Sequence, residues 1–179
     1  MNLHAACEFC ARTLADASFW RWTLLAIHGA FQGTLVLALQ GSDGLAALRP
    51  RDAAKWMTAY RAKDEPLPVG KLDDFLKLYA KVKDPEQMRR NLNARAFAPG
   101  EQHDRSVEWL HDARCEFLHF KPGTSWSVEL AGLPRICLDV LDVIDFLLWE
   151  SGAVMFYEEA DTARARATTA MLRAQLASR

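Results

Sequence analysis

The chain has 179 residues, of which 50% are hydrophobic and 25% are charged, and its formal net charge is −1. This length and composition are typical of one globular domain with a sizeable core. The near-neutral charge excludes a generally basic protein that coats nucleic acid, so any RNA contact has to come from a local cluster of cationic side chains.

No basic segment followed by an apolar run opens the sequence, and charged or polar residues interrupt its longest apolar stretches. Four cysteines are too few for a disulfide framework in a chain of this length. We therefore predict a cytoplasmic protein with no membrane span.

Helical periodicity runs through the N-terminal half of the chain. Residues 2–16 predict one amphipathic helix, and residues 18–40 predict a longer one that Gly41-Ser42-Asp43-Gly44 terminates. Three shorter helices are predicted to follow, at residues 51–62, 71–81 and 85–95. The first two are separated by Pro66-Leu67-Pro68, and Asp84-Pro85 provides an N-cap and first residue for the third.

The C-terminal half continues this pattern after Ala98-Pro99-Gly100, with a predicted helix at residues 101–120. Apolar and polar residues alternate within residues 121–132, which predicts an extended loop or short strand. The most apolar helix covers residues 133–149, and an alanine- and arginine-rich helix runs on to Ala177. With no repeat or linker in the sequence, we predict a single all-α domain over residues 1–179, folded as a helical bundle.

The end of the 101–120 helix carries the most informative residues. On a helix over residues 108–120, the apolar side chains share one face, and Arg114 and His119 are predicted to lie on the other, away from the core. Arginine is a permanent cation shaped to hold phosphate, and histidine titrates near neutral pH. This pair is what a protein needs to cleave phosphodiesters without a metal ion.

The wider string Arg114-Cys115-Glu116-Phe117-Leu118-His119-Phe120-Lys121-Pro122, with Trp126-Ser127-Val128-Glu129-Leu130 and Gly132-Leu133-Pro134 after it, resembles a bacterial branch of the HEPN superfamily of small all-α domains. The resemblance is good over residues 89–150 and looser over 18–40. Residues 45–88 resemble a family-specific helical insertion. The resemblance implies a HEPN-like bundle that acts as a metal-independent endoribonuclease or RNA-binding factor of the defence or toxin type, with no cofactor.

The resemblance also implies roles for individual residues. Arg114 would hold the scissile phosphate, and His119 would act as general acid or base at the RNA 2′-hydroxyl and the leaving oxygen. Cys115 stands where the family usually has a polar Asn or Asp, and Lys121 stands where toxins silenced by adenylylation carry tyrosine. The residues expected to support the site are Cys115, Glu116, Lys121 and Trp126.

The implied partner is a second copy of the chain, because HEPN motif helices face each other across a dimer cleft. Residues five apart lie about 140° apart on an ideal helix, so Arg114 and His119 would converge better across two copies than within one. RNA, a cognate antitoxin and a nucleotidyltransferase-type protein are further partners, although Lys121 argues against control by adenylylation. The alternative function is a non-catalytic HEPN module for dimerisation or for binding a nucleotide or protein.

Structural interpretations remain open for each of these residues. Arg114 could pair with Glu108 or Asp112, and His119 could stabilise the C-terminal end of its helix. His111, Cys115 and His119 recur every four residues, but three ligands on a straight helix cannot reach one ion, so no metal site is predicted. His28 is expected to be a core histidine. Trp126 is expected either to stack on a base or to seal the core, and we favour the core.

Overall fold

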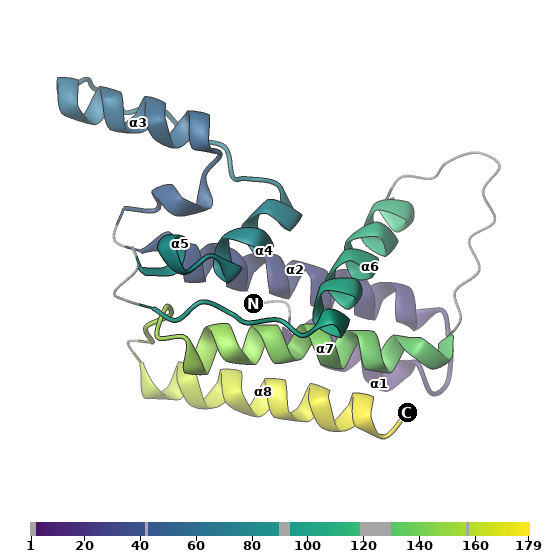
Figure 1. Cartoon of the computed structure of the whole chain (residues 1–179). Helices are drawn as coiled ribbons and strands as arrows, with labels where there is room; N and C mark the ends of the chain where they lie inside the picture. Colours follow the sequence, from purple (N-terminus) through teal and green to yellow (C-terminus); the bar gives the residue numbers. More distant parts are fainter. Residues whose placement is uncertain (1–2, 42, 90–93, 119–129, 157) are drawn as a thin grey trace. The chain divides into compact units, whose positions relative to one another are not determined.

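The computed structural model describes residues 3–41, 43–89, 94–118, 130–156 and 158–179. These residues are predominantly helical and contain no strand, which confirms the all-α prediction. In chain order the elements are α1 (Leu3–Arg12), α2 (Phe19–Gln40), the 3₁₀ turn η1 (Leu45–Ala47), α3 (Pro50–Ala62), α4 (Phe75–Lys83), α5 (Pro85–Arg89), α6 (Glu101–Leu118), the 3₁₀ turn η2 (Leu130–Gly132), α7 (Leu133–Asp145), the π-helical η3 (Phe146–Glu150) and α8 (Glu159–Ala177) (Figure 1).

Helix α1 ends four residues before its predicted end. The Thr13 hydroxyl donates to the carbonyl of Cys10 at 2.9 Å, and the guanidinium of Arg179 donates to the same carbonyl at 2.7 Å. Side chains thus satisfy carbonyl groups that the helix leaves without an internal partner.

Two further boundaries are shifted where the backbone bonds to a distant part of the chain. Helix α4 begins at Phe75 rather than residue 71 because Asp73 N donates to the carbonyl of Ala47 at 3.0 Å, outside any helix. Arg95, expected in a helix over 85–95, is not helical, and its backbone N–H donates to Ser151 O at 2.8 Å. In both segments a backbone N–H bonds to a carbonyl far away in the sequence and not to one within a helix.

The loop or strand expected at residues 121–132 falls largely outside the described residues, and so do His119, Lys121 and Trp126. Its described end, residues 130–132, forms the 3₁₀ turn η2 rather than a strand. Leu130 is 44% exposed there, so it is not on the buried side of the predicted alternation.

The chain divides into two compact units. Unit 1 comprises Met1–Gly33, Pro99–Phe146 and Met155–Arg179, and unit 2 comprises Thr34–Ala98 and Leu147–Val154. The segment expected to be an insertion, residues 45–88, lies within unit 2. Each unit has its own set of packed helices and is described separately below.

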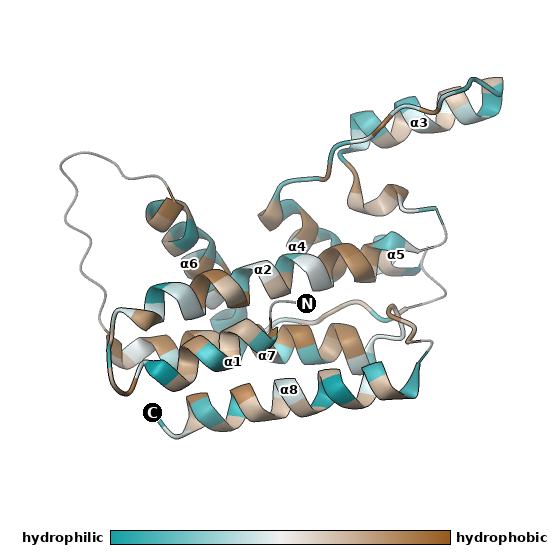
Figure 2. Ribbon diagram, turned by 180° about the vertical axis from the view of Figure 1, so that it is seen from behind, coloured by the Kyte–Doolittle hydropathy of each residue, from teal (hydrophilic) through white to brown (hydrophobic). Residues whose placement is uncertain are grey.

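In unit 1, α7 packs against both α6 and α8, and α8 packs against α1 (Figure 1). Figure 2 shows α7 as mostly apolar and α8 with many hydrophilic positions. The core of α7 includes Cys137, Val140 and Ile144, which are fully buried. A buried polar pair also joins α6 to α7, because the Ser106 hydroxyl donates to Asp139 Oδ2 at 2.6 Å.

Two further carboxylates of α7 pair with Arg173 of α8, whose guanidinium lies 2.8 Å from Asp142 and 2.7 Å from Asp145. These charges hold the helix pair together at its half-exposed edge. The aspartates spaced along α7 therefore serve as structural ion-pair partners, as the helical spacing of an arginine-paired stripe predicts.

In unit 2, α4 and α5 pack on each other. An isolated antiparallel bridge joins Leu48 to Leu72, and the Lys81 ammonium lies 2.9 Å from Asp73 and donates to the carbonyls of Ala46 and Leu48. Residues 46–48 and 72–73 are thereby tied to α4. They form the base from which α3 and the returning chain extend away from α4 and α5 (Figure 1).

Helix α2 is long and apolar enough by composition to cross a membrane, a property that core helices and signal sequences share. In the structure 61% of its most apolar window is buried within the protein. That burial is the arrangement expected for a core helix.

Candidate functional site

The motif helix α6 does not present Arg114 as the sequence predicted. Val107, Leu110 and Ala113 form the buried stripe of this helix. Arg114 lies next to this stripe, because it follows Leu110 by one helical turn and Val107 by two. Arg114 is half-buried on the inner side of α6 rather than on a face averted from the core. The prediction considered the helix from residue 108, which left out Val107 and so misplaced the buried stripe.

His28 of α2 and His111 of α6 meet on this inner side. Their rings stack, with centroids 5.9 Å apart and planes 26° from parallel. His28 is only 4% exposed, as expected for a core histidine, whereas His111 is half-buried. His111 therefore points toward α2, where its ring packs on a buried partner.

Arg114 affects the protonation of this pair. Burial, the positive charge of Arg114 and the neighbouring His111, in decreasing order of effect, together lower the pKa of His28 to about 4. His28 is consequently neutral at physiological pH. No described carboxylate forms an ion pair with Arg114, so the pairing with Glu108 or Asp112 considered from the sequence is not observed.

Two contacts complete the site. Cys115 Sγ lies 3.8 Å from His111 Nε2, one turn apart on α6. Arg21 of α2 donates to the carbonyl of Phe117 at 2.7 Å, and its guanidinium carbon lies 5.6 Å from the centroid of the Phe117 ring. Arg21 thus holds the last turn of α6 and contributes a second cation to this side of unit 1.

The other predicted site residues are placed only in part. Glu116 is half-buried on α6, two residues after Arg114. His119, Lys121 and Trp126 lie outside the described residues. Among the residues that the structure describes, no cluster of three histidine, cysteine or acidic side chains could hold a metal ion. The contact between His111 and Cys115 supplies two donors, fewer than a zinc site requires.

No family model, curated protein or solved structure matches this chain. The function has to be argued from the site itself. What the site offers is a half-buried arginine without a described carboxylate partner, a second arginine at the helix end, and two stacked imidazoles of which one is held neutral.

The sequence contains no signal that could have assigned His28 or Arg21 to this site. They lie on a different predicted helix, far from the motif in sequence, and helical periodicity marks His28 simply as a core position. His111 was recognised, but as a metal-stripe candidate. Its contact with Cys115 follows from their four-residue spacing, whereas its contact with His28 depends on how α2 and α6 pack.

The buried His28 predicts an acid-sensitive fold. In the unfolded chain its pKa is about 6.5, so below that pH the unfolded state binds a proton that the folded state does not bind until about pH 4. Stability is therefore lost as the pH falls from 6.5 to 4. Between pH 7.5 and pH 5 we expect this group to cost about 2 kcal/mol of unfolding free energy. Urea denaturation at the two pH values measures the difference.

The control for this prediction is the exposed histidine of α1, His4, which lies 3.5 Å from Glu8. His28→Gln should reduce the pH dependence of stability by about 2 kcal/mol, and His4→Gln should leave it nearly unchanged. An equal pH dependence in wild type and His28→Gln would show that His28 is not the acid-sensitive group.

Proposed function

We propose that this chain is a HEPN-like protein that binds RNA and cleaves it without a metal ion, using Arg114 and His119. The observation that carries the proposal is the state of Arg114. It is half-buried, close enough to His28 for its charge to lower the pKa of that imidazole, and pairs with no described carboxylate. A partly desolvated cation is costly unless an anion compensates it, and a phosphodiester is an anion that the guanidinium fork fits.

The neighbouring groups suit the same chemistry. In the proposed reaction Arg114 binds a non-bridging phosphate oxygen and stabilises the charge that develops on it. His119 accepts the proton of the 2′-hydroxyl, whose oxygen attacks phosphorus. The protonated imidazole then donates a proton to the 5′ oxygen of the next nucleotide as the bond between that oxygen and phosphorus breaks. The products are a 2′,3′-cyclic phosphate and a 5′-hydroxyl. A second copy of the chain is proposed to contribute the other half of the site.

One specific observation favours the alternative of a non-catalytic HEPN module. Cys115 occupies the position after Arg114 and contacts His111 at 3.8 Å. A thiol is a weak hydrogen-bonding group compared with an Asn amide or an Asp carboxylate. In the alternative, the same cationic surface binds a nucleotide or a partner protein and performs no cleavage.

The proposal is tested with a 5′-labelled single-stranded RNA incubated with the purified full chain in EDTA. We expect cleavage to persist in EDTA and to leave 2′,3′-cyclic phosphate ends, because the chemistry uses the 2′-hydroxyl and no ion. His119→Ala should abolish cleavage, while His103→Ala, on the first turns of α6 and 3.6 Å from Asp142, should retain it. Sedimentation of the same sample should show a dimer.

Three results would count against the proposal. Activity that disappears in EDTA and returns with zinc would point to metal chemistry. Cleavage that survives in His119→Ala would assign the acid–base role to another group. Binding of RNA without cleavage, together with cleavage by Cys115→Asn, would establish the non-catalytic alternative and show that Cys115 disables the site.

A further inference from the structure

Helix α3 is unusual because it has no buried residue. We call Pro50 to Gly70, which comprises α3 and the chain that returns from it, the arm. The sequence predicts a helix at residues 51–62, and in the structure this helix projects from its base in unit 2 (Figure 1). A helix with no fully buried side chain has a surface available to a partner.

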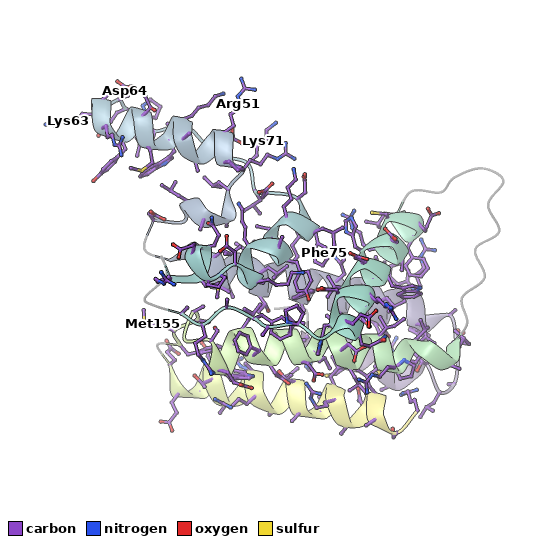
Figure 3. All side chains as sticks on the ribbon, viewed as in Figure 1. Arg51, Lys63, Asp64, Lys71, Phe75 and Met155 are labelled. Atoms are coloured by element: carbon purple, nitrogen blue, oxygen red, sulfur yellow. The ribbon has the colours of Figure 1, made fainter. Side chains whose placement is uncertain are left out.

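The positive charge of the arm is concentrated in α3 and its C-cap. Between Arg49 and Lys63 the chain has five basic side chains and one acidic one, Asp52, in a protein whose net charge is −1. Arg49 is paired with Asp74 at 2.9 Å. The other four form no ion pair with a described carboxylate, and Figure 3 shows Arg51 and Lys63 at opposite ends of α3. They are Arg51, Lys55, Arg61 and Lys63.

An aromatic pair lies along the same helix. The rings of Trp56 and Tyr60 are stacked one turn apart, with centroids 5.2 Å apart and planes 11° from parallel. Tyr60 is 58% exposed, and Trp56 is half-buried. The result is an aromatic surface on one side of α3, with the cationic side chains distributed around the rest of the helix and its C-cap. Such a surface suits an unpaired base, which stacks on the rings while the neighbouring phosphates contact the cations.

The end of α3 adds a further positive group. Lys63 has φ 58°, a left-handed conformation in which glycine is the usual residue, and its backbone N–H caps the helix. The lysine side chain costs backbone strain that glycine would avoid and keeps a cation at the tip of the arm. Asp64 and Glu65 follow immediately, so the positive surface is confined to α3 and its C-cap.

We infer that the arm is a docking surface for single-stranded nucleic acid, with Tyr60 and Trp56 stacking on bases and Arg51, Lys55, Arg61 and Lys63 contacting phosphates. The inference rests on the proposed function only in taking RNA as the strand. An anionic membrane is less well matched, because the apolar side of α3 consists of Ala53, Trp56, Met57 and Tyr60 and offers little aliphatic surface for insertion among lipid chains.

The test measures binding of a fluorescent 2′-O-methyl oligouridine to the full chain by anisotropy. This probe lacks the nucleophilic 2′-hydroxyl, so the result does not depend on whether the protein cleaves RNA. We expect Tyr60→Ala to weaken binding about 5- to 150-fold, the change that corresponds to losing the stacking of one base. The double variant Arg51→Gln, Lys55→Gln should lower the slope of log Kd against log salt by about 1.4, since two phosphate contacts are removed.

The matched control is Arg89→Gln, which removes an exposed arginine of α5 paired with Glu86 at 2.9 Å. It should leave both affinity and salt slope unchanged. Glutamine retains helix propensity at exposed positions, and circular dichroism confirms folding of each variant. Lack of binding by wild type, or equal binding by the arm variants and Arg89→Gln, would overturn the inference. Loss of binding to phosphatidylserine vesicles in the arm variants, without an effect on the oligonucleotide, would reassign the arm to membranes.

Discussion

Arg114→Ala is expected to slow the proposed metal-independent RNA cleavage by about 10²–10³-fold, the usual cost of removing one group that stabilises developing negative charge. The reason is local, because Arg114 is half-buried beside His28 and His111 and no described carboxylate competes with a phosphate for it. Arg114→Lys should retain part of the rate, since an ammonium keeps the charge but cannot form two parallel hydrogen bonds to one phosphate. Single-turnover cleavage in EDTA measures all three proteins.

The matched control is Arg105→Ala, which removes an exposed arginine of the same helix that is paired with Glu101. It should cleave at the wild-type rate. A second measurement does not depend on activity. Arg114 lowers the pKa of His28, so Arg114→Ala should raise that pKa from about 4 when His28 is titrated by NMR. An unchanged cleavage rate in Arg114→Ala would remove Arg114 from the reaction, whatever the pKa of His28 does.

Asp139→Ala is expected to lower the unfolding free energy by about 2–4 kcal/mol, the largest stability change that we predict. Asp139 is 1% exposed and accepts a hydrogen bond from the buried Ser106 hydroxyl at 2.6 Å. Removing the carboxylate leaves that hydroxyl without its acceptor between α6 and α7. Arg135 Nε lies 2.9 Å from Asp139 Oδ1, but Arg135 is mostly exposed and can be solvated by water after the change.

Two comparisons separate this hydrogen bond from the general effect of removing a charge. Asp142→Ala removes a 43% exposed carboxylate that pairs with Arg173 and should cost about 1 kcal/mol or less. The double variant Ser106→Ala, Asp139→Leu should be more stable than Asp139→Ala, because neither partner is then left unsatisfied. Equal losses for Asp139→Ala and Asp142→Ala in urea denaturation would contradict a special role for the buried bond.

Most helices of this chain could be predicted from local signals. Pro50, Pro85 and Pro134 begin or nearly begin α3, α5 and α7, and the glycines at 41 and 44 end α2, because these residues restrict or permit backbone conformations within one or two positions. Among the boundaries that were wrong are those where a distant group forms the hydrogen bond. Arg95 bonding to Ser151 and Asp73 bonding to Ala47 are examples.

In the candidate site, too, some features follow from local sequence and others depend on how the helices pack. The sequence determined that Arg114, His111 and Cys115 lie within a turn or so of one another on one helix, because helical geometry depends only on spacing. The direction in which Arg114 points was misjudged, since the buried stripe of α6 is set by the helices that pack on it. The stacking of His28 on His111, and the fall in the pKa of His28 that accompanies its burial, exist only when α2 and α6 are packed together.

The exposure of the arm is the clearest feature that the tertiary structure decided and the sequence did not. Amphipathic periodicity predicts that residues 51–62 form a helix, and α3 covers Pro50–Ala62. The periodicity does not say how much of the helix is buried, and in the structure Tyr60 is 58% exposed and no residue of α3 is buried. Periodicity describes how side chains are distributed around one helix, whereas burial requires a second surface, and the bonds of Lys81 and Asp73 direct the chain away from α4.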